Sequence, residues 1–426
     1  MIFIEYSHSY IIPFLFIMYG ILCFTSKSRV QGIGLPFIEY NTNKEFTVRS
    51  KKTYFKDMWA KVHPDTHELM ELIGPTGDYK AEVDALRGFY GLHYKYPSSY
   101  PPVRDYKPSS TPVKAYTIDQ ASTLDRDDAL SITRDGDEIT FGIHITDLAR
   151  RLSPEWLTWA RSRGSSAYWE SGTKPIFPPS LAHETLSLTK GHTYPCLSLF
   201  YTYKNEELCC MSFGPCDVEI VDNLTYDNFE THPDREFFEA LSNKKEPTEI
   251  VEWCMIQYNL YMAINLPDVL LRVQDETDEP ARYDYFGTHE TMEARPYTHA
   301  TSPIRRFADF YNQCMYHNLG TVLSREEIDE LNKRMNDIRA FHQREAVMSL
   351  AYEFKYKPCV MEAFVEANDD GRNICLRIKD KRVWIPLSDT YYDEPICQEL
   401  KDGGCHQIVC FGIHKNGKAA LRIRLV

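Results

Sequence analysis

The sequence of 426 residues lacks an apolar stretch long enough to cross a membrane as a helix. Its main apolar run, Tyr10 to Phe24, has fifteen residues and contains Pro13 and Gly20, whereas a spanning helix needs about 20 residues. A secretory signal peptide is not indicated either, because no Lys or Arg precedes the run. We therefore expect no membrane association, and we assign residues 1–34 to an apolar N-terminal extension of uncertain role.

The 12 cysteines include no Cys-x-x-Cys pair and no spacing typical of zinc ligands. Cys209 and Cys210 are adjacent, so a bond between them is not expected. The pattern argues against a zinc site and favours reduced thiols in a cytoplasmic protein, with the nucleus as the alternative compartment.

Basic residues are in the minority, since 48 Lys and Arg stand against 61 Asp and Glu and give a formal net charge of −13. A chain of this charge is not expected to coat nucleic acid indiscriminately, although a local basic patch can still bind phosphates. Internal repeats and low-complexity tracts are also absent. Aromatic residues are plentiful, and 28 Tyr and 22 Phe can both fill a core and provide surfaces for stacking.

The stretch from Thr117 to Ala129 is the most informative, because it holds four aspartates within ten residues. These are Asp119, Asp125, Asp127 and Asp128. A half-buried strand is predicted before it, and two strands joined by Asp135-Gly136, a hairpin signal, are predicted after it. Crowded carboxylates raise one another's pKa unless a cation lies among them. Mg²⁺ is favoured, with Mn²⁺ as the alternative, because hard cations prefer oxygen ligands.

The predicted hairpin also brings other residues toward this acidic loop. A turn at residues 135–136 would place His144 opposite Asp127, and the second strand would return Asp147 to the same end. Spacing alone is equally compatible with a solvated acidic turn or with a calcium loop.

Two long motifs together resemble the ribonuclease II catalytic (RNB) domain. The first joins Thr117–Ala129 to Gly142-Ile143-His144-Ile145-x-Asp147, and the second runs far downstream from His299 to Asp309. The resemblance covers roughly residues 75 to 355 and is closer to the exosome-type eukaryotic and viral branch. It implies an α+β fold in which mixed sheets with surrounding helices form the RNB catalytic domain, flanked by small all-β OB-fold modules.

This resemblance implies a hydrolytic 3′→5′ exoribonuclease that releases nucleoside 5′-monophosphates from single-stranded RNA by a two-metal mechanism. Asp119 and Asp128 would then be primary metal ligands, while Asp125 and Asp127 would complete the metal site and take part in catalysis. Arg305 would stabilise charge on the scissile phosphate. We expect the protein to act as a monomer.

The resemblance also indicates where RNA would bind. Tyr168 holds the position of a tyrosine that stacks on RNA near its 3′ end, with a core tyrosine as the alternative. The family's second stacking aromatic cannot be placed in this sequence. The full set of expected RNA contacts is Tyr168, Ser302, Arg305, Arg306, His144, Arg344, Lys379, Lys381 and Arg382.

The second motif predicts a helix with Ser302 as its N-cap, Pro303 in the first turn and an end near Gly320. Arg305 and Arg306 would then lie where cations oppose the helix dipole. A phosphate bound by the free N–H groups and the two guanidiniums would account for them. A surface ion pair is the alternative for Arg306.

Four regions are expected along the chain. After the extension at 1–34, residues 35–75 form a reduced cold-shock or OB-like region, 76–357 the RNB catalytic domain, and 358–426 a C-terminal OB-fold RNA-binding barrel of five short strands. Lys379, Lys381 and Arg382 would give this barrel a basic face, and a solvated strand edge is the alternative for them.

Two other functions fit part of the pattern. One is a catalytically weak or inactive RNB-fold RNA-binding protein, against which the presence of all four aspartates argues. The other is a non-nuclease D-x-D metal-dependent transferase, against which the block from Ser302 to Asp309 argues.

Overall fold

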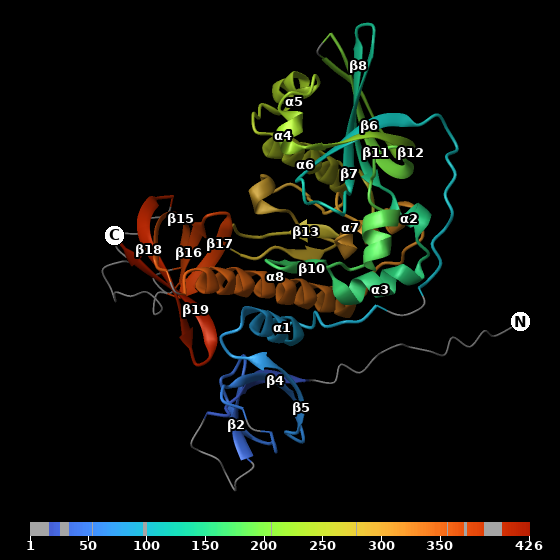
Figure 1. Cartoon of the computed structure of the whole chain (residues 1–426). Helices are drawn as coiled ribbons and strands as arrows, with labels where there is room; N and C mark the ends of the chain where they lie inside the picture. Colours follow the sequence, from blue (N-terminus) through green and yellow to red (C-terminus); the bar gives the residue numbers. More distant parts are fainter. Residues whose placement is uncertain are drawn as a thin grey trace, which may run out of the picture. The chain divides into compact units, whose positions relative to one another are not determined.

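The computed structural model describes residues 17–25, 34–52, 54–96, 100–205, 207–277, 279–355, 357–369, 373–386 and 403–426. Residues 10–16 of the apolar run lie outside these ranges. Helices and separate sheets alternate along the chain, which confirms the predicted α+β class (Figure 1). The chain divides into two compact units. The first consists of Met1–Lys95, Trp169–Ser171 and Arg339–Val426, and the second of Tyr96–Tyr168 and Gly172–Ile338.

The N-terminal part of the first unit is a five-stranded sheet with the order β3-β2-β1-β4-β5. Its strands are β1 (Met18–Leu22), β2 (Gly34–Glu39), β3 (Glu45–Arg49), β4 (Met58–Val62) and β5 (Leu69–Pro75). A bridge between Arg49 and Glu68 connects the two outer strands. The predicted boundary at residue 34 is wrong, because β1 pairs with both β2 and β4. Four of its five residues are buried, which accounts for its apolar sequence.

The C-terminal part of the first unit has the strand order β17-β16-β15-β18-β19. Its strands are β15 (Cys359–Asp369), β16 (Asn373–Ile378), β17 (Lys381–Pro386), β18 (Cys405–Lys415) and β19 (Lys418–Leu425). The five predicted strands are thus present. Gly412 packs on the end of α8 (Arg325–Glu353), where a Cβ would lie 1.6 Å from the Ala351 carbonyl oxygen.

A buried carboxylate connects the two parts of the first unit. Glu82 belongs to α1 (Tyr79–Phe89) and accepts hydrogen bonds from the Ala419 amide and the Tyr352 hydroxyl. Arg344 of α8 lies 3.5 Å from Glu82 and also donates to the Tyr40 hydroxyl. Burial raises the pKa of Glu82, and the Arg344 charge opposes this rise. These bonds join β19, α1 and α8 around one charge pair.

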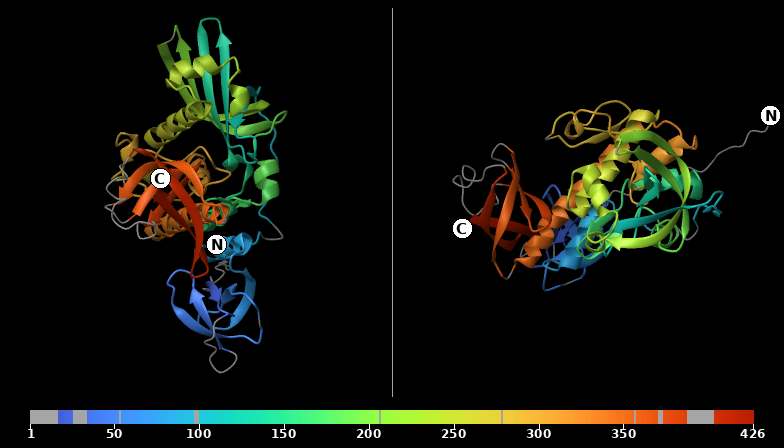
Figure 2. Two further views of the ribbon diagram at one scale, coloured as in Figure 1. Left: turned by 60° about the vertical axis from the view of Figure 1, so that its left-hand side comes forward. Right: turned by 90° about the horizontal axis from the view of Figure 1, so that it is seen from above.

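The second unit contains a closed barrel with the strand order β11-β12-β6-β7-β8. Its strands are β6 (Val113–Asp119), β7 (Asp128–Asp135), β8 (Glu138–Thr146), β11 (Thr193–Lys204) and β12 (Glu207–Thr225). The pairing of β12 with β6 is parallel, and the other pairs are antiparallel. The long strands extend past α4 (Tyr226–Phe229) and α5 (Arg235–Ser242) (Figures 1 and 2).

Two apolar cores hold the elements of this unit together. One lies between the barrel and α6 (Pro247–Asn265) and includes Ile143, Leu199 and Tyr258. The other packs α2 (Leu148–Arg151) and α3 (Glu155–Arg163) against α7 (Phe307–Tyr316). Shorter elements complete the chain: β9 (Ala167–Trp169), β10 (Gly172–Lys174), β13 (Leu271–Val273), β14 (Arg282–Asp284) and helical turns at Ser180–Thr185 and Glu290–Met292.

The segment that enters β6 is anchored by one carboxylate. Asp217 of β12 accepts hydrogen bonds from the Ser109 and Ser110 amides and from the Tyr106 hydroxyl. Burial acts to raise the pKa of Asp217, but these donors outweigh it and lower the pKa to about 2. The carboxylate therefore stays ionised and fixes the start of the strand that carries Asp119.

Across the described ranges, the longest and most apolar helices fall short of what a membrane-spanning helix requires.

Candidate active site

The β7–β8 hairpin turns one residue later than its sequence predicts. Asp135 pairs with Glu138, so the turn residues are Gly136 and Asp137. Gly136 has a φ of +60°, which fits the first position of a type II′ turn. As a result Ala129, not Asp127, lies opposite His144.

His144 points into the barrel and is fully buried. Its two ring nitrogens are each 2.8 Å from a serine hydroxyl, those of Ser198 and Ser131. Burial lowers the pKa of His144 to about 3, so the ring is neutral. The predictions that His144 reaches the acidic loop and contacts RNA are therefore wrong. His144 lies on the same face as its partners Ser131 and Ser198.

Asp147 also lies away from the acidic loop. It is fully buried, and its Oδ2 is 2.7 Å from Nε2 of His317, the residue after α7. The predicted fifth aspartate of the site therefore has a structural contact with His317 instead.

Asp127 brings the two distant motifs together. The Ile304 amide, 177 residues away in sequence, donates to Asp127 Oδ1 at 2.7 Å, and Arg305 Nε lies 3.3 Å from Oδ2. Only 2% of Asp127 is exposed. Burial raises the pKa of this carboxyl well above its ordinary value, although the Arg305 charge opposes the rise. The neighbouring guanidinium and amide are thus what stabilise the carboxylate here.

The segment from Ser302 to Arg306 is a turn, and α7 begins only at Phe307. The predicted N-cap at Ser302 is wrong, because the N-cap residue of α7 is Arg306. The Ser302 amide donates to Asp309 Oδ1 within the turn. The Arg306 guanidinium binds both carboxylate oxygens of Asp309, so Arg306 forms an ion pair, as the alternative to phosphate binding predicted. Arg305, in contrast, keeps 49% of its side chain exposed.

Asp119 and Asp128 form a repelling pair where β6 ends and β7 begins. Burial raises the pKa of Asp119 to about 6 and that of Asp128 to about 7, and for Asp128 the Asp119 charge is the second cause. Asp119 Oδ2 is buried without a hydrogen-bond partner, and its nearest cation is Arg126, at 3.9 Å. A cation beside these two carboxylates would relieve both the repulsion and the unpaired oxygen.

The four-aspartate metal site is not assembled as predicted. Within the part of the chain that the structure describes, no three acidic, histidine or cysteine side chains converge closely enough to hold a metal ion. Asp127 is engaged by Ile304 and Arg305, and Asp125 accepts a hydrogen bond from Tyr168. The pair Asp119 and Asp128 nevertheless fits a hard divalent cation, because it offers oxygen donors and an unpaired buried oxygen.

Two tyrosines lie beside these acids. Tyr168 is 38% exposed, so it is not a core residue, and its hydroxyl donates to Asp125 Oδ2 at 3.1 Å. Tyr226 is a site residue that no sequence pattern indicated. Burial and the charges of Asp128 and Asp119 raise its pKa. Only the parallel pairing of Asp119 with Thr225, invisible in the sequence, brings Tyr226 there.

The basic residues predicted to bind RNA in the first unit are paired with carboxylates. Lys379 pairs with Glu353, Lys381 with Glu170 and Arg382 with Glu366. Arg344 pairs with Glu82 and bonds to the Ala419 carbonyl. The prediction of an uncompensated basic face is wrong, because acidic partners come from other elements.

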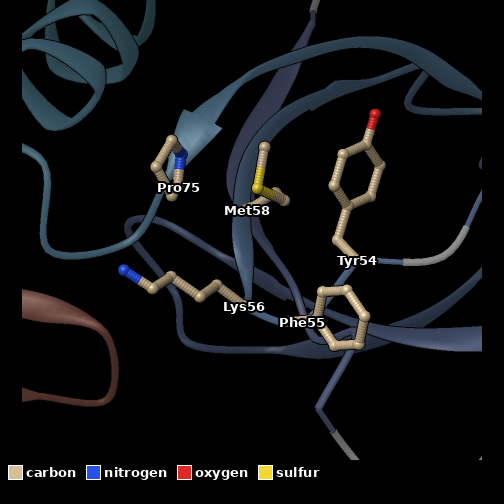
Figure 3. A pocket seen from close by; sticks show the side chains of 5 residues that line it. All are labelled: Tyr54, Phe55, Lys56, Met58 and Pro75. Atoms are coloured by element: carbon tan, nitrogen blue, oxygen red, sulfur yellow. The ribbon is translucent and has the colours of Figure 1, made fainter.

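A different surface of the same unit carries cations that lack ion pairs within the described ranges. Arg49 ends β3, and the loop between β3 and β4 contains Lys51, Lys52 and Lys56. Phe55 is fully exposed and Tyr54 is 42% exposed. Both rings, with Lys56, Met58 and Pro75, line a cavity of about 320 Å³ (Figure 3). Aromatic rings beside cations suit stacking of bases with neutralisation of phosphates.

Sequence comparisons with known proteins match the same catalytic-domain family as the motifs of this site. The RNB domain family model matches residues 109–266. An uncharacterized ribonuclease of Synechocystis is 35% identical over 127 residues, which are 28% of this chain and 19% of that protein. The chloroplastic/mitochondrial ribonuclease II of Arabidopsis thaliana is 37% identical over 100 residues, which are 22% of this chain and 12% of that protein. The chain thus spans a fifth or less of the length of these relatives.

Solved structures resemble the fold over nearly the whole chain. The apo form of Mycoplasma genitalium RNase R has a TM-score of 0.69 at 14% identity, covering 96% of this chain and 89% of that one. Yeast Ssd1, a pseudonuclease, has a TM-score of 0.67 at 12% identity, covering 96% and 82%. At these identities the likeness concerns the fold.

Replacing Asp128 by Asn should stabilise the metal-free chain. The native pair keeps its protons to higher pH than the unfolded chain, so the free energy of unfolding should fall as pH rises from about 4 to 7. Asp128→Asn should remove most of this slope and add about 1–2 kcal/mol at about pH 7.5. Urea denaturation in EDTA across this pH range measures both.

Asp135→Asn, at the exposed end of β7, is the matched control and should change neither quantity. Mg²⁺ should raise the melting temperature of the wild type and of this control, but not that of Asp128→Asn. Equal stability of the Asp128 variant and the wild type in EDTA would contradict the repelling pair.

Proposed function

We propose that this chain, which belongs to the RNB-domain (ribonuclease II) family, is an exoribonuclease that degrades single-stranded RNA from its 3′ end to nucleoside 5′-monophosphates. One observation carries the proposal. The buried Asp127 binds the Ile304 amide and lies against the Arg305 guanidinium, so two motifs far apart in sequence form one site.

The charges of this site suit a phosphodiester substrate. Arg305 is half-exposed and is oriented by Asp127, so it can contact a phosphate without losing its buried partner. Asp119 and Asp128 would hold the divalent cation, with Mg²⁺ expected and Mn²⁺ as the alternative. Such a cation would supply the Lewis acidity that phosphodiester hydrolysis needs. A second ion, as in a two-metal mechanism, stays a prediction.

Tyr168 gives the site an exposed aromatic ring, whereas Tyr226 packs against the core between the barrel and α6. The amide of Ser166 donates to the Arg305 carbonyl, which places Tyr168, two residues on, beside the same turn. Its exposed ring can stack on a base of any identity while its hydroxyl holds Asp125.

A catalytically inactive RNA-binding protein is the second candidate. Two observations favour it: no three of the acids converge among the described residues, and yeast Ssd1, a pseudonuclease, shares the fold. The transferase hypothesis has no comparable support.

Cleavage of a 5′-labelled oligo(A) in Mg²⁺ tests the main proposal. The wild type should produce a descending ladder and release 5′-monophosphates, and EDTA should stop it. Asp128→Asn should lose at least about 10²–10³ in rate, because it removes one electrostatic partner of the reaction, while RNA affinity in EDTA stays within error. Asp135→Asn should cleave normally. A wild type that binds the oligonucleotide but leaves it intact in Mg²⁺ and Mn²⁺ would establish the inactive alternative.

Two substitutions at Tyr168 separate its two contacts. Tyr168→Phe keeps the stacking ring but loses the bond to Asp125, so it should lower the cleavage rate and leave the final product length unchanged. Tyr168→Ala also removes a stack worth about 1–3 kcal/mol, so the final products should lengthen. Product ladders resolve the two effects, and identical ladders for wild type and Tyr168→Ala would exclude stacking.

RNA affinity in the first unit should come from the β3–β4 loop. Changing Lys51, Lys52 and Lys56 together to Gln should weaken binding of oligo(U). It should also reduce the slope of log affinity against log salt concentration by about 2, since each phosphate contact on a single strand contributes about 0.7 to that slope. The matched triple change at Lys379, Lys381 and Arg382 should leave the salt slope unchanged, because carboxylates already neutralise these cations. Fluorescence anisotropy titrations measure both quantities. A larger loss of affinity and of salt slope in the Lys379, Lys381 and Arg382 variant than in the loop variant would refute this assignment.

A further inference from the structure

Two cysteines that are far apart in sequence face each other in the C-terminal sheet. Strands β15 and β18 are antiparallel, and their register places Cys359 opposite Cys410. Facing residues in such a pair have Cα atoms about 4.5–5.5 Å apart and project their side chains to the same face. A disulfide needs a Cα separation of about 4.4–6.8 Å. The backbone therefore already meets the requirement for a bond, although both residues are free thiols.

The two thiols differ in their access to solvent. Cys359 is the first residue of β15 and is exposed, whereas Cys410 is buried on the inner face with Ile408. Burial, followed by the nearby Cys359, raises the pKa of the Cys410 thiol to about 12. A dissolved oxidant would consequently meet Cys359 first, and Cys410 would remain a protonated thiol beside it.

Four other cysteines do not combine an exposed thiol with a buried cysteine directly opposite it. Cys405 is exposed on the same strand β18, but it faces Phe364. Cys210 is exposed and faces Thr202. Cys196 faces Cys216 in the barrel, but Cys196 is fully buried and Cys216 is only partly exposed, so neither thiol is as accessible as that of Cys359. These residues serve as internal comparisons for the pair in β15 and β18.

We propose that Cys359 and Cys410 are an oxidative modification site, which a peroxide converts to a reversible disulfide. The Cys359 thiolate attacks one peroxide oxygen, forming a sulfenic acid and releasing water after protonation. Sγ of Cys410 then attacks the sulfenic sulfur, the S–O bond breaks, and a second water leaves with the proton of Cys410. Two thiols thus lose two electrons in total, and hydrogen peroxide accepts them.

The bond would lock the junction between α8 and β15. The Gly412 amide already donates to the Phe354 carbonyl at 3.2 Å, and its Cα lies too close to Ala351 for any side chain. The chain from Phe354 to Cys359 would then be tied to β18 at both ends. Lys355 lies in this segment, and trypsin can cleave after it but not after Lys357, which precedes Pro358. Cleavage after Lys355 therefore reports on whether the junction opens.

The experiment uses the full chain, reduced and then exposed to hydrogen peroxide, with remaining thiols blocked by N-ethylmaleimide. Non-reducing peptide mapping should find a peptide that links Cys359 to Cys410 and is lighter by two hydrogen atoms than its two parts. Dithiothreitol should remove it. Oxidation should slow tryptic cleavage after Lys355 severalfold, without slowing cleavage elsewhere.

Cys359→Ser, at an exposed position, should abolish both the linked peptide and the protection from trypsin. Cys405→Ser, an exposed position on the same strand, should retain both. Recovery of Cys410 as an unmodified thiol while Cys359 is oxidised to sulfinic acid would overturn the proposal. So would a link from Cys359 to Cys405 in place of Cys410. None of these outcomes depends on whether the chain cleaves RNA.

Discussion

The contact between Asp127 and the turn at residues 302–306 is the interaction on which the site depends. A carboxylate that is almost completely buried is unfavourable unless donors replace its water. Here the Ile304 amide donates to Oδ1 and the Arg305 charge lies 3.3 Å from Oδ2, and both come from a single turn. The turn itself is held by Asp309, which binds the Ser302 amide and the Arg306 guanidinium. Charge pairing thus decides the backbone geometry of the site.

This contact divides the four aspartates of the acidic loop into three roles. Asp127 holds the second motif in place, and Asp125 is bonded to an exposed tyrosine. Asp119 and Asp128 remain as a pair whose mutual repulsion is relieved only by a proton or a cation. In the sequence the four residues are equivalent, because proximity along the chain does not reveal which oxygen each one offers.

Features that arise from local pattern were predictable. The acidic loop between strands, the five C-terminal strands and the resemblance to the RNB domain all follow from short stretches of sequence. Features that depend on distant partners were not. The acidic partners of Lys379 and Lys381 lie on α8 and at Glu170, so the basic face disappears only in three dimensions. Ser302 has the residue type of an N-cap, but the N-cap residue of α7 is Arg306.

The sequence separation of 177 residues between Asp127 and Ile304 also sets the order in which the parts of the site can form during synthesis. At a synthesis rate of about 5–20 residues per second, the acidic loop leaves the ribosome about 10–35 s before the turn that completes it. The hairpin that follows the loop can form early, because its contacts are local, whereas the contact that buries Asp127 spans a long sequence separation and must wait. A nascent chain therefore carries an unfinished site until the turn at residues 302–306 has emerged and folded back onto Asp127.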